Sequence, residues 1–493
     1  MGILDEFDPT RDGWFFDNWN ETTDFDWDLY RRTYLAINPT DDVIEAPLDV
    51  AFYQIFKSCA ANGNCGGMSM LGLALYKYGG YMGYCSPASF YTGGVNGPDR
   101  TDLHQAINVM QGRQFSAPGI RNFLDVVKAG QLNDGVAAWN SIQSGLGSGD
   151  YCMLSLANGL FGTAAHTVIP FRADTSGSAL VLHVWDPDRP YNTHAEYYDG
   201  DYNKIVITGP TDWTYDQNAA GLYSDGVLYS GSMNGWFFPI PISLEIHKGP
   251  QPISAGFALT GLTTLFVSGV GAAVTQIEDD QGRRLYTSDR LHRSRGDLET
   301  STARRLPGVV PWPWRGRAGD DLPGELFFLQ RPPGSSPLTV SVRGGEYQIK
   351  HLSSSHLSEV TAGPAGSATK DRVRLEGSFD DHQVIAVSTR APRRLFDIRQ
   401  LRQGSPGAWR SVRVRNAVVT SDQLRVHAAR AFDVVEISGT AARRGLDIEL
   451  ARYAGGKVAR RTLSQPVPAG KALRIAPTDW DRLSRAKIEQ VLE

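Results

Sequence analysis

A cysteine flanked by small residues lies where a glycine-rich segment leads into an amphipathic pattern, and it could act as a nucleophile. The segment reads Asn62-Gly-Asn-Cys65-Gly-Gly-Met-Ser69. Unpaired backbone N–H groups and the positive end of a helix dipole favour a thiolate at such a position. The same N–H groups can hold an oxyanion that develops on a substrate carbonyl. Buried cysteines near helix ends are also common and inert, so chemistry requires partners for the thiol.

The expected partners are an imidazole and a carboxylate, and one predicted hairpin supplies both. His166 opens a strand pattern that runs to Arg172, and Asp186 directly follows the strand pattern Ala179–Trp185. Facing residues of an antiparallel hairpin have indices with a constant sum, which a turn near Ser176 sets to about 352. His166 and Asp186 are therefore predicted to face each other. The carboxylate would accept a hydrogen bond from Nδ1–H and leave Nε2 toward the thiol.

The other imidazoles and thiols lack these surroundings. His183 has the opposite strand parity from Asp186 and is predicted to be a packed or solvated strand residue. Asp186 opens an Asp-Pro-Asp-Arg-Pro segment, so its alternative role is to cap a turn. The residues without a facing acid or a helix start are His104, His194, Cys59, Cys85 and Cys152.

Neither a metal nor an organic cofactor is predicted. No cysteine pair or cysteine–histidine pair has the spacing of a zinc site. The Asp199-Gly-Asp201 segment begins like a calcium loop, but Lys204 stands where such a loop requires glycine, which favours a polar turn.

The elements that must position these groups are a helix and a set of strands. Met68, Leu71, Leu75 and Tyr78 recur at helical spacing, and Gly79-Gly80 predicts the helix end. A second helix is predicted around Ile120–Ala129. Alternating patterns predict strands at Cys152–Leu156, His166–Arg172, Ala179–Trp185, Lys204–Thr208 and Phe237–Ile242.

Length and charge divide the chain. A chain of 493 residues is too long for one hydrophobic core, and its 41% hydrophobic content is that of a globular protein. Residues 1–250 hold 13 Lys and Arg against 28 Asp and Glu, whereas residues 251–493 hold 36 against 25. Because these basic residues are scattered, nucleic-acid binding is not expected. The basic half could dock an acidic protein partner, although solvated arginines explain it equally well.

No segment predicts secretion or membrane insertion. The first 50 residues carry 13 acidic and three basic side chains and lack the apolar run of a signal peptide. Four cysteines do not form a disulfide framework, which favours a cytoplasmic protein or export by a route without a cleavable signal peptide. Gly256–Val274 is uncharged but laced with Gly, Thr and Ser, so buried strands are favoured over a membrane span.

Four regions result from these patterns. Residues 1–45 form an aromatic N-terminal arm, which either packs its rings on the next domain or covers an active site as a pro-segment. Residues 46–248 form a mixed domain, 249–324 a β-rich connecting region, and 325–493 a mostly-β, sandwich-like accessory region. The segment from Thr478 to Glu493 predicts a terminal amphipathic helix.

The order Cys65, His166, Asp186 resembles the papain-like cysteine peptidase superfamily, in which the nucleophile starts a helix and its partners lie on a following sheet. The likeness is to bacterial members, including bacteriocin-processing-type peptidases, with a GNC-x-GMS-type segment and an H-x-V…V-x-D-P strand pair. Residues 63–69, 166–168 and 184–187 carry these motifs here. The resemblance covers about residues 46–248 and implies an α+β papain-like domain of N-terminal helices and an antiparallel sheet.

Two positions depart from the papain pattern. The family usually has a glutamine six residues before the nucleophile as an oxyanion donor, and Cys59 stands there instead. Asn62 is the candidate substitute, with Gln54 and Asn64 as alternatives. An aspartate in place of asparagine as third member keeps the acceptor role.

The resemblance implies a thiol hydrolase that cleaves peptide or protein substrates through an acyl-enzyme, without a cofactor. The acidic character of the N-terminal half favours basic substrates. A transglutaminase or amidase would use the same triad. A non-catalytic scaffold that works through its β domains is the alternative of another class.

Overall fold

The described residues of the computed structural model fall into two compact units. The first comprises those within 1–39 and 53–256, and the second those within 40–52, 257–312 and 321–493. The described ranges are 2–3, 7–20, 25–35, 49–50, 52–54, 57, 63–85, 87–157, 165–218, 221–233, 236–245, 251–252, 262–279, 282, 284–287, 309–311, 324–330, 337–352, 356–376, 382–405, 408–420, 423–429, 432–439, 445–455, 457–467, 471–477, 479–480 and 482–492.

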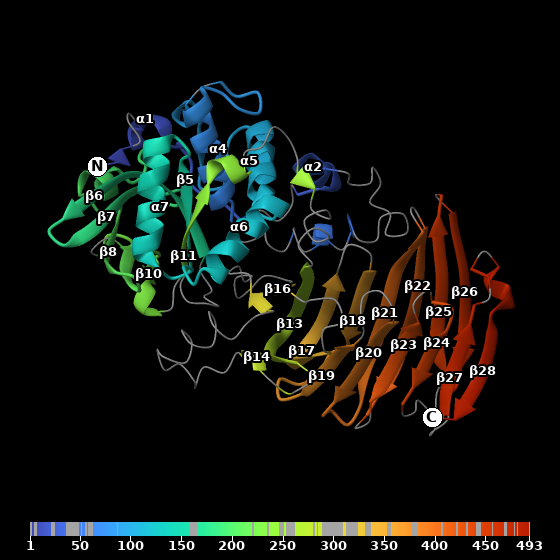
Figure 1. Ribbon diagram of the computed structural model, residues 1–493. Helices are drawn as coiled ribbons and strands as arrows, with labels where there is room; N and C mark the ends of the chain where they lie inside the picture. The colour runs from blue at the N-terminus through green and yellow to red at the C-terminus, as the bar shows by residue number, and fades with distance from the viewer. Residues whose placement is uncertain are drawn as a thin grey trace. The chain divides into compact units, whose positions relative to one another are not determined.

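The four longer helices described in the first unit, α4, α5, α6 and α7, lie beside its sheet (Figure 1). Helix α4 spans Cys65–Tyr78 and ends at Gly79 in the left-handed conformation, which confirms the helix and its predicted stop. Helix α6, Ala117–Lys128, confirms the second predicted helix. The others are α1 (Pro9–Asp12), α2 (Trp27–Thr33), α5 (Thr101–Arg113), α7 (Gly135–Ser148), α8 (Ala195–Asp199), α9 (Ile242–Glu245), and the 3-10 turns η1 (Ala88–Phe90) and η3 (Gly231–Met233).

Helix α7 was not predicted because glycines, which are poor helix formers, interrupt its pattern. Its Gly145 serves close packing: a Cβ there would lie 2.5 Å from the carbonyl oxygen of Asp150. Asp134 starts the helix by accepting a hydrogen bond from the Ala137 N–H at 2.9 Å.

The sheet of the first unit has eight described strands, with β10-β9-β8-β7-β6-β5-β11 in order and β1 paired with β6. Its pairs are antiparallel, and the five strands predicted for this region are all present. The bounds are β1 (Gly2–Ile3), β5 (Cys152–Ala157), β6 (Ala165–Ser176), β7 (Ala179–Trp185), β8 (Lys204–Gly209), β9 (Asp212–Asp216), β10 (Leu228–Ser230) and β11 (Trp236–Pro241). Two small pairs are β2 (Tyr34–Leu35) with β12 (Gln251–Pro252) and β3 (Gly93–Gly94) with β4 (Gly97–Pro98).

Most aromatic side chains of the N-terminal arm are core residues of the first unit. The indole N–H of Trp14 donates to the carbonyl oxygen of Met68 in α4 at 2.8 Å. Trp19 packs its ring 4.4 Å from that of His104 on α5. Trp14, Phe16, Trp19, Phe25, Tyr30 and Tyr34 are all buried. The arm thus packs its rings on the domain that follows it.

The second unit is an antiparallel sheet in which the described strands form two branches on either side of β17. On one side β18, β21, β22, β25 and β26 follow β17, and on the other β19, β20, β23, β24, β27 and β28. The bounds are β13 (Leu262–Glu278), β14 (Arg284–Thr287), β15 (Val309–Pro311), β16 (Gly324–Gln330), β17 (Leu338–Leu352), β18 (His356–Ala362), β19 (Lys370–Glu376), β20 (His382–Thr389), β21 (Arg394–Ser405), β22 (Ala408–Val419), β23 (Leu424–Ala429), β24 (Val435–Ser438), β25 (Leu446–Ala454), β26 (Lys457–Gln465), β27 (Lys471–Ala476) and β28 (Lys487–Leu492).

The two branches of the sheet separate at a glycine pair and then face each other. The first half of β17 pairs with β19 and the second half with β18, and Gly344-Gly345 between them has positive φ. The buried amide of Gln400 on β21 donates to carbonyl oxygens of Gln383 on β20 and Val426 on β23. The sheet is therefore curled, and it confirms the mostly-β character predicted for the C-terminal part.

The predicted terminal helix is wrong. Residues 483–485 form the 3-10 turn η5, and Lys487–Leu492 is strand β28, paired along its length with β27. The open edge of β27 offers hydrogen bonds that override the helical spacing of the apolar residues.

Gly256–Val274 is described from Leu262 onward, where it belongs to strand β13, as the strand interpretation expected. Within the described ranges, no helix combines the length and the apolar character needed to cross a bilayer.

Candidate active site

Cys65 is the first residue of α4, and a glycine pair lets α5 approach it closely. A Cβ on Gly66 would lie 2.1 Å from Nε2 of Gln114, and one on Gly67 would lie 2.2 Å from the carbonyl oxygen of Ile107. The Gly67 N–H donates to Oε1 of Gln111 at 2.7 Å. The N–H groups of Cys65 and Gly66 belong to the first helical turn, where no intrahelical acceptor exists.

Helix α4 lies against β6 and so brings Cys65 to His166. The hydroxyl of Ser69 donates to the carbonyl oxygen of Thr167 at 3.2 Å, one residue from His166. The Cys65 thiol is near enough to the His166 imidazole to contribute to the raised pKa of the ring. Both side chains are buried, with 6% of Cys65 and 2% of His166 exposed.

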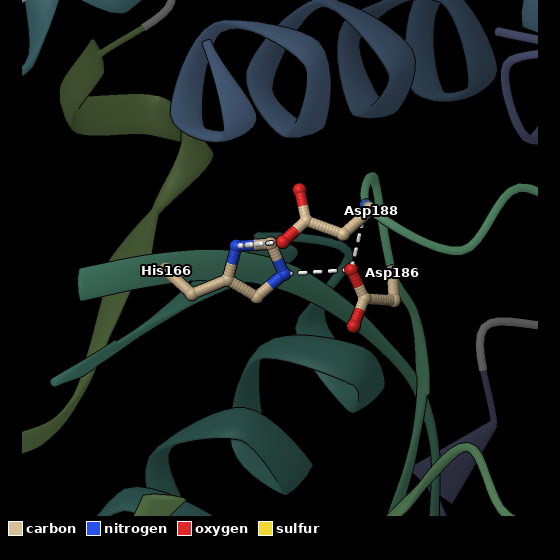
Figure 2. Close-up of side chains that lie close together, drawn as sticks. All are labelled: His166, Asp186 and Asp188. Atoms are coloured by element: carbon tan, nitrogen blue, oxygen red, sulfur yellow. Dashed lines mark hydrogen bonds and ion pairs between the residues drawn. The ribbon is translucent and has the colours of Figure 1, made fainter. Parts of the chain in front are cut away.

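The imidazole of His166 lies between two carboxylates (Figure 2). Its Nε2–H donates to Oδ1 of Asp186 at 2.6 Å, and its Nδ1 lies 3.6 Å from Oδ2 of Asp188. The predicted assignment of the ring nitrogens is therefore wrong. Because Nε2 is bonded to Asp186, Nδ1 is the nitrogen left to face the thiol of Cys65.

The hairpin register explains this orientation and corrects the prediction that His166 and Asp186 stand directly opposite. The turn is centred between Gly177 and Ser178 rather than near Ser176, since Ser176 pairs with Ala179, and the last pair is Ile169 with Trp185. Continued by three residues, this register places Asp188, not Asp186, opposite His166. Asp186 is a diagonal neighbour and reaches the far nitrogen of the ring.

A β-bulge at Phe171 keeps His166 and Asp186 on the same face. Pro170 pairs with Val184 and Arg172 with His183, so Phe171 is an extra residue on β6. Each such insertion reverses the face on which all later side chains lie. Proline lacks the N–H of a regular ladder and is tolerated at bulges.

Asp186 is fully buried and accepts four hydrogen bonds. Besides His166, Oδ1 accepts from the Asp188 N–H at 2.7 Å. Oδ2 accepts from the Tyr215 hydroxyl and from Nε2 of Gln217 at 2.9 Å. The Tyr197 hydroxyl donates to that of Tyr215 at 2.9 Å and so orients it. These donors hold the carboxylate in one position.

Charge pairing outweighs burial at both partners. Burial lowers the pKa of His166, but the charges of Asp186 and Asp188 and the hydrogen bonds to Asp186 and Cys65 hold it well above the usual 6.5. Burial raises the pKa of Asp186, but the His166 charge and the hydrogen bonds from His166, Gln217 and Tyr215 bring it well below 3.8. The pair is thus stabilised as imidazolium and carboxylate.

The structure brings Cys65, His166 and Asp186 together, whereas Asn62 and Cys59 lie outside the described residues. Burial raises the pKa of Cys152 to about 12, as suits an unreactive strand residue. His183 is packed against Arg172, with Nε2 2.7 Å from the guanidinium.

Three side chains of the site were missed at the sequence level: Asp188, Tyr215 and Gln217. Asp188 is the second acid of the Asp-Pro-Asp segment, in which the sequence pattern assigned a role to Asp186 alone. Trp213, Tyr215 and Gln217 alternate along β9 and just beyond it, and all three are buried. That alternation is the signal that predicts an inward face.

His166, Asp186 and Asp188 could together offer ligands to a metal ion, since one ligand atom from each lies within 4.8 Å of the others. However, both oxygens of Asp186 already accept two hydrogen bonds each, and Nε2 of His166 is engaged with one of them. A cation would have to displace these donors. The set therefore fits an acid–imidazole pair better than a metal centre.

Comparison with known proteins finds no matching family model, no matching curated protein and no matching solved structure.

Proposed function

We propose that this protein is a cysteine peptidase, a thiol hydrolase with Cys65 as nucleophile, His166 as general base and acid, and Asp186 as the orienting acid. The observation that carries the proposal is the buried His166, whose Nε2 is held 2.6 Å from Oδ1 of Asp186. The Cys65 thiol at the start of α4 contributes to the raised pKa of this ring. A nucleophile, a base and a third group that orients the base are the minimal set for acyl transfer.

The first half of the reaction forms the acyl-enzyme. Nδ1 of His166 takes the thiol proton, and the Cys65 sulfur attacks the carbonyl carbon of the scissile peptide bond. The N–H groups of Cys65 and Gly66 can donate to the oxyanion. The C–N bond then breaks as Nδ1–H gives its proton to the departing amine.

The second half releases the acid product. Nδ1 of His166 takes a proton from a water molecule, whose oxygen attacks the thioester carbon, and the C–S bond breaks to restore the thiol. Throughout both halves Asp186 keeps Nε2 protonated and stabilises the imidazolium that forms. The raised pKa of His166 supports this role, because it favours the state in which the thiol proton has moved to the ring.

Thiol labelling tests this function directly. Iodoacetamide at limiting concentration, with the modified site mapped by mass spectrometry, should modify Cys65 at least tenfold faster than the exposed Cys85. His166→Ala should remove that advantage, and Cys65→Ala should leave only slow labelling. Equal, slow labelling of all cysteines in the wild type would refute the proposal.

A peptide-library digest separates hydrolysis from transfer. The proposal expects free carboxyl products that require Cys65. If products appear only when a primary amine is added, and carry that amine in amide linkage, the enzyme is a transglutaminase-type acyl transferase instead. The docking of an acidic protein partner on the basic C-terminal half stays a separate prediction.

A further inference from the structure

Asn18, in the N-terminal arm, bonds to both segments that carry the candidate triad. Its Oδ1 accepts a hydrogen bond from the backbone N–H of Asn64, next to Cys65, at 2.7 Å. Its Nδ2 donates to Oδ1 of Asp188 at 2.9 Å, and its backbone N–H donates to the carbonyl oxygen of Pro187 at 3.0 Å. One residue thus links the nucleophile loop to the turn that holds Asp186.

The position of Asn18 is set by the packing around it. Trp19 beside it is buried, as is Phe16. Gly63 has φ of +117°, and a Cβ there would lie 3.0 Å from Nδ2 of Asn18. The nucleophile loop therefore adopts a backbone conformation that leaves room for this amide.

Asp188 needs such a restraint because it lies on the thiol side of the imidazole. Its Oδ2 is 3.6 Å from Nδ1 of His166, just beyond hydrogen-bonding distance. If this carboxylate moved closer, it would accept the Nδ1–H bond and compete with Cys65 for the proton. Asn18 holds one carboxylate oxygen, and Gln217 lies 3.4 Å from the other.

We propose that Asn18 is a positioning residue, which fixes the distance between the nucleophile loop and the acid turn and keeps Asp188 from accepting the Nδ1–H hydrogen bond of His166. This role rests on the proposed function. It makes the N-terminal arm a working part of the active site, in contrast to a pro-segment that is removed. Asn18 acts through Asp188 and Asn64 and is not expected to contact the scissile bond.

The test is the pH profile of Cys65 alkylation by iodoacetamide in the full-length protein. Asn18→Ala should slow alkylation at pH 6 by about tenfold, the effect of losing a hydrogen bond to a charged group. It should also shift the pH of half-maximal rate upward, because the Nδ1–H of the imidazolium then donates to Asp188 and stabilises the Cys65 thiolate less. Among the described residues, the titratable groups that face His166 are Cys65 from α4, Asp186 and Asp188 after β7, and Tyr229 from β10, whose ring is 6.2 Å away.

A double-mutant comparison separates this role from a merely structural one. In an Asp188→Ala background, Asn18→Ala should produce no upward shift, because the competing carboxylate is gone. Asn20→Ala is the matched control, since Asn20 is an exposed amide of the same arm. Its profile should superimpose on that of the wild type.

Three outcomes would overturn the proposal: an Asn18→Ala profile identical to that of Asn20→Ala, an upward shift that persists without Asp188, or a wild-type profile for Asn18→Asp. Asn18→Asp keeps the acceptor for the Asn64 N–H but loses the donor to Asp188. It replaces Asn18→Ala as the test if that variant does not fold. If wild-type Cys65 reacts no faster than Cys85, the proposed function itself fails. If Cys65 is alkylated rapidly, and this rate depends on His166 but not on Asn18, only the positioning role of Asn18 fails.

Discussion

Asp186→Asn changes one oxygen of the candidate triad to an amide nitrogen and removes the only charge on that side chain. The carboxylate accepts four hydrogen bonds, two on each oxygen. An asparagine has one carbonyl oxygen for two of these donors, and its NH₂ group meets the other two. The Tyr215 hydroxyl can rotate and accept, but Nε2 of Gln217 cannot.

The expected cost to stability is about 3 kcal/mol at pH 6. A lost hydrogen bond to a charged group is worth about 1.5–3 kcal/mol, and an unpaired buried charge costs about 3–5 kcal/mol unless the group can become neutral. His166 can do so by releasing its proton. The pKa of His166 should then fall, because the negative charge of Asp186 no longer offsets the effect of burial, which lowers this pKa.

The pH dependence has a defined sign at each end. The pKa of Asp186 is lowered on folding, so its share of stability is present above pH 3.8 and is lost as pH falls through the folded value. The pKa of His166 is raised, so its share is present below pH 6.5 and is lost as pH rises through the folded value. The free energy of unfolding of the wild type should therefore exceed that of Asp186→Asn by the largest amount between about pH 4 and 6.5.

Unfolding of the first unit can be followed through Cys152, which is buried in β5 and becomes accessible to a thiol reagent when the unit opens. Urea titrations at pH 5 and pH 9, read by Cys152 labelling, should give a difference between wild type and Asp186→Asn that is larger at pH 5. Alkylation of Cys65 at pH 6 should fall by about 10- to 100-fold. An unfolding difference below about 0.5 kcal/mol at both pH values, with an unchanged alkylation profile, would refute the assignment.

Three further substitutions test neighbouring parts of the site. Tyr215→Phe removes a donor to Asp186 and should cost about 1–3 kcal/mol of unfolding free energy, measured by urea titration, with a smaller loss of Cys65 reactivity than Asp186→Asn causes; a gain in stability would contradict it. Gly67→Ala places a Cβ against the carbonyl oxygen of Ile107 and should displace α5. The melting temperature should then fall by several degrees, whereas an unchanged melting temperature would mean that α4 and α5 separate without cost. His183→Ala should leave the rate of Cys65 alkylation as in the wild type, because that imidazole is packed against Arg172; a loss as large as that of His166→Ala would make His183 the base.

Much of the local structure was predictable because it depends on neighbours in the chain. The helix that begins at Cys65 follows from apolar spacing and ends at Gly79, whose left-handed conformation suits glycine. The hairpin strands follow from alternation and turn residues. The C-terminal strand β28 was mistaken for a helix because its pairing partner, β27, is a tertiary contact that apolar spacing does not reveal.

From the sequence alone, three residue types suited to thiol chemistry could be placed at a helix start and at two strand ends. Which of their atoms meet was decided by tertiary structure. The extra residue at Phe171 reverses the strand parity, and the register puts Asp188 opposite His166 and Asp186 at its far nitrogen. Tyr215, Gln217 and Asn18 complete the site from 29 or more residues away in the chain. A bulge and a distant hydrogen bond depend on how strands and loops pack, and local periodicity carries no record of either.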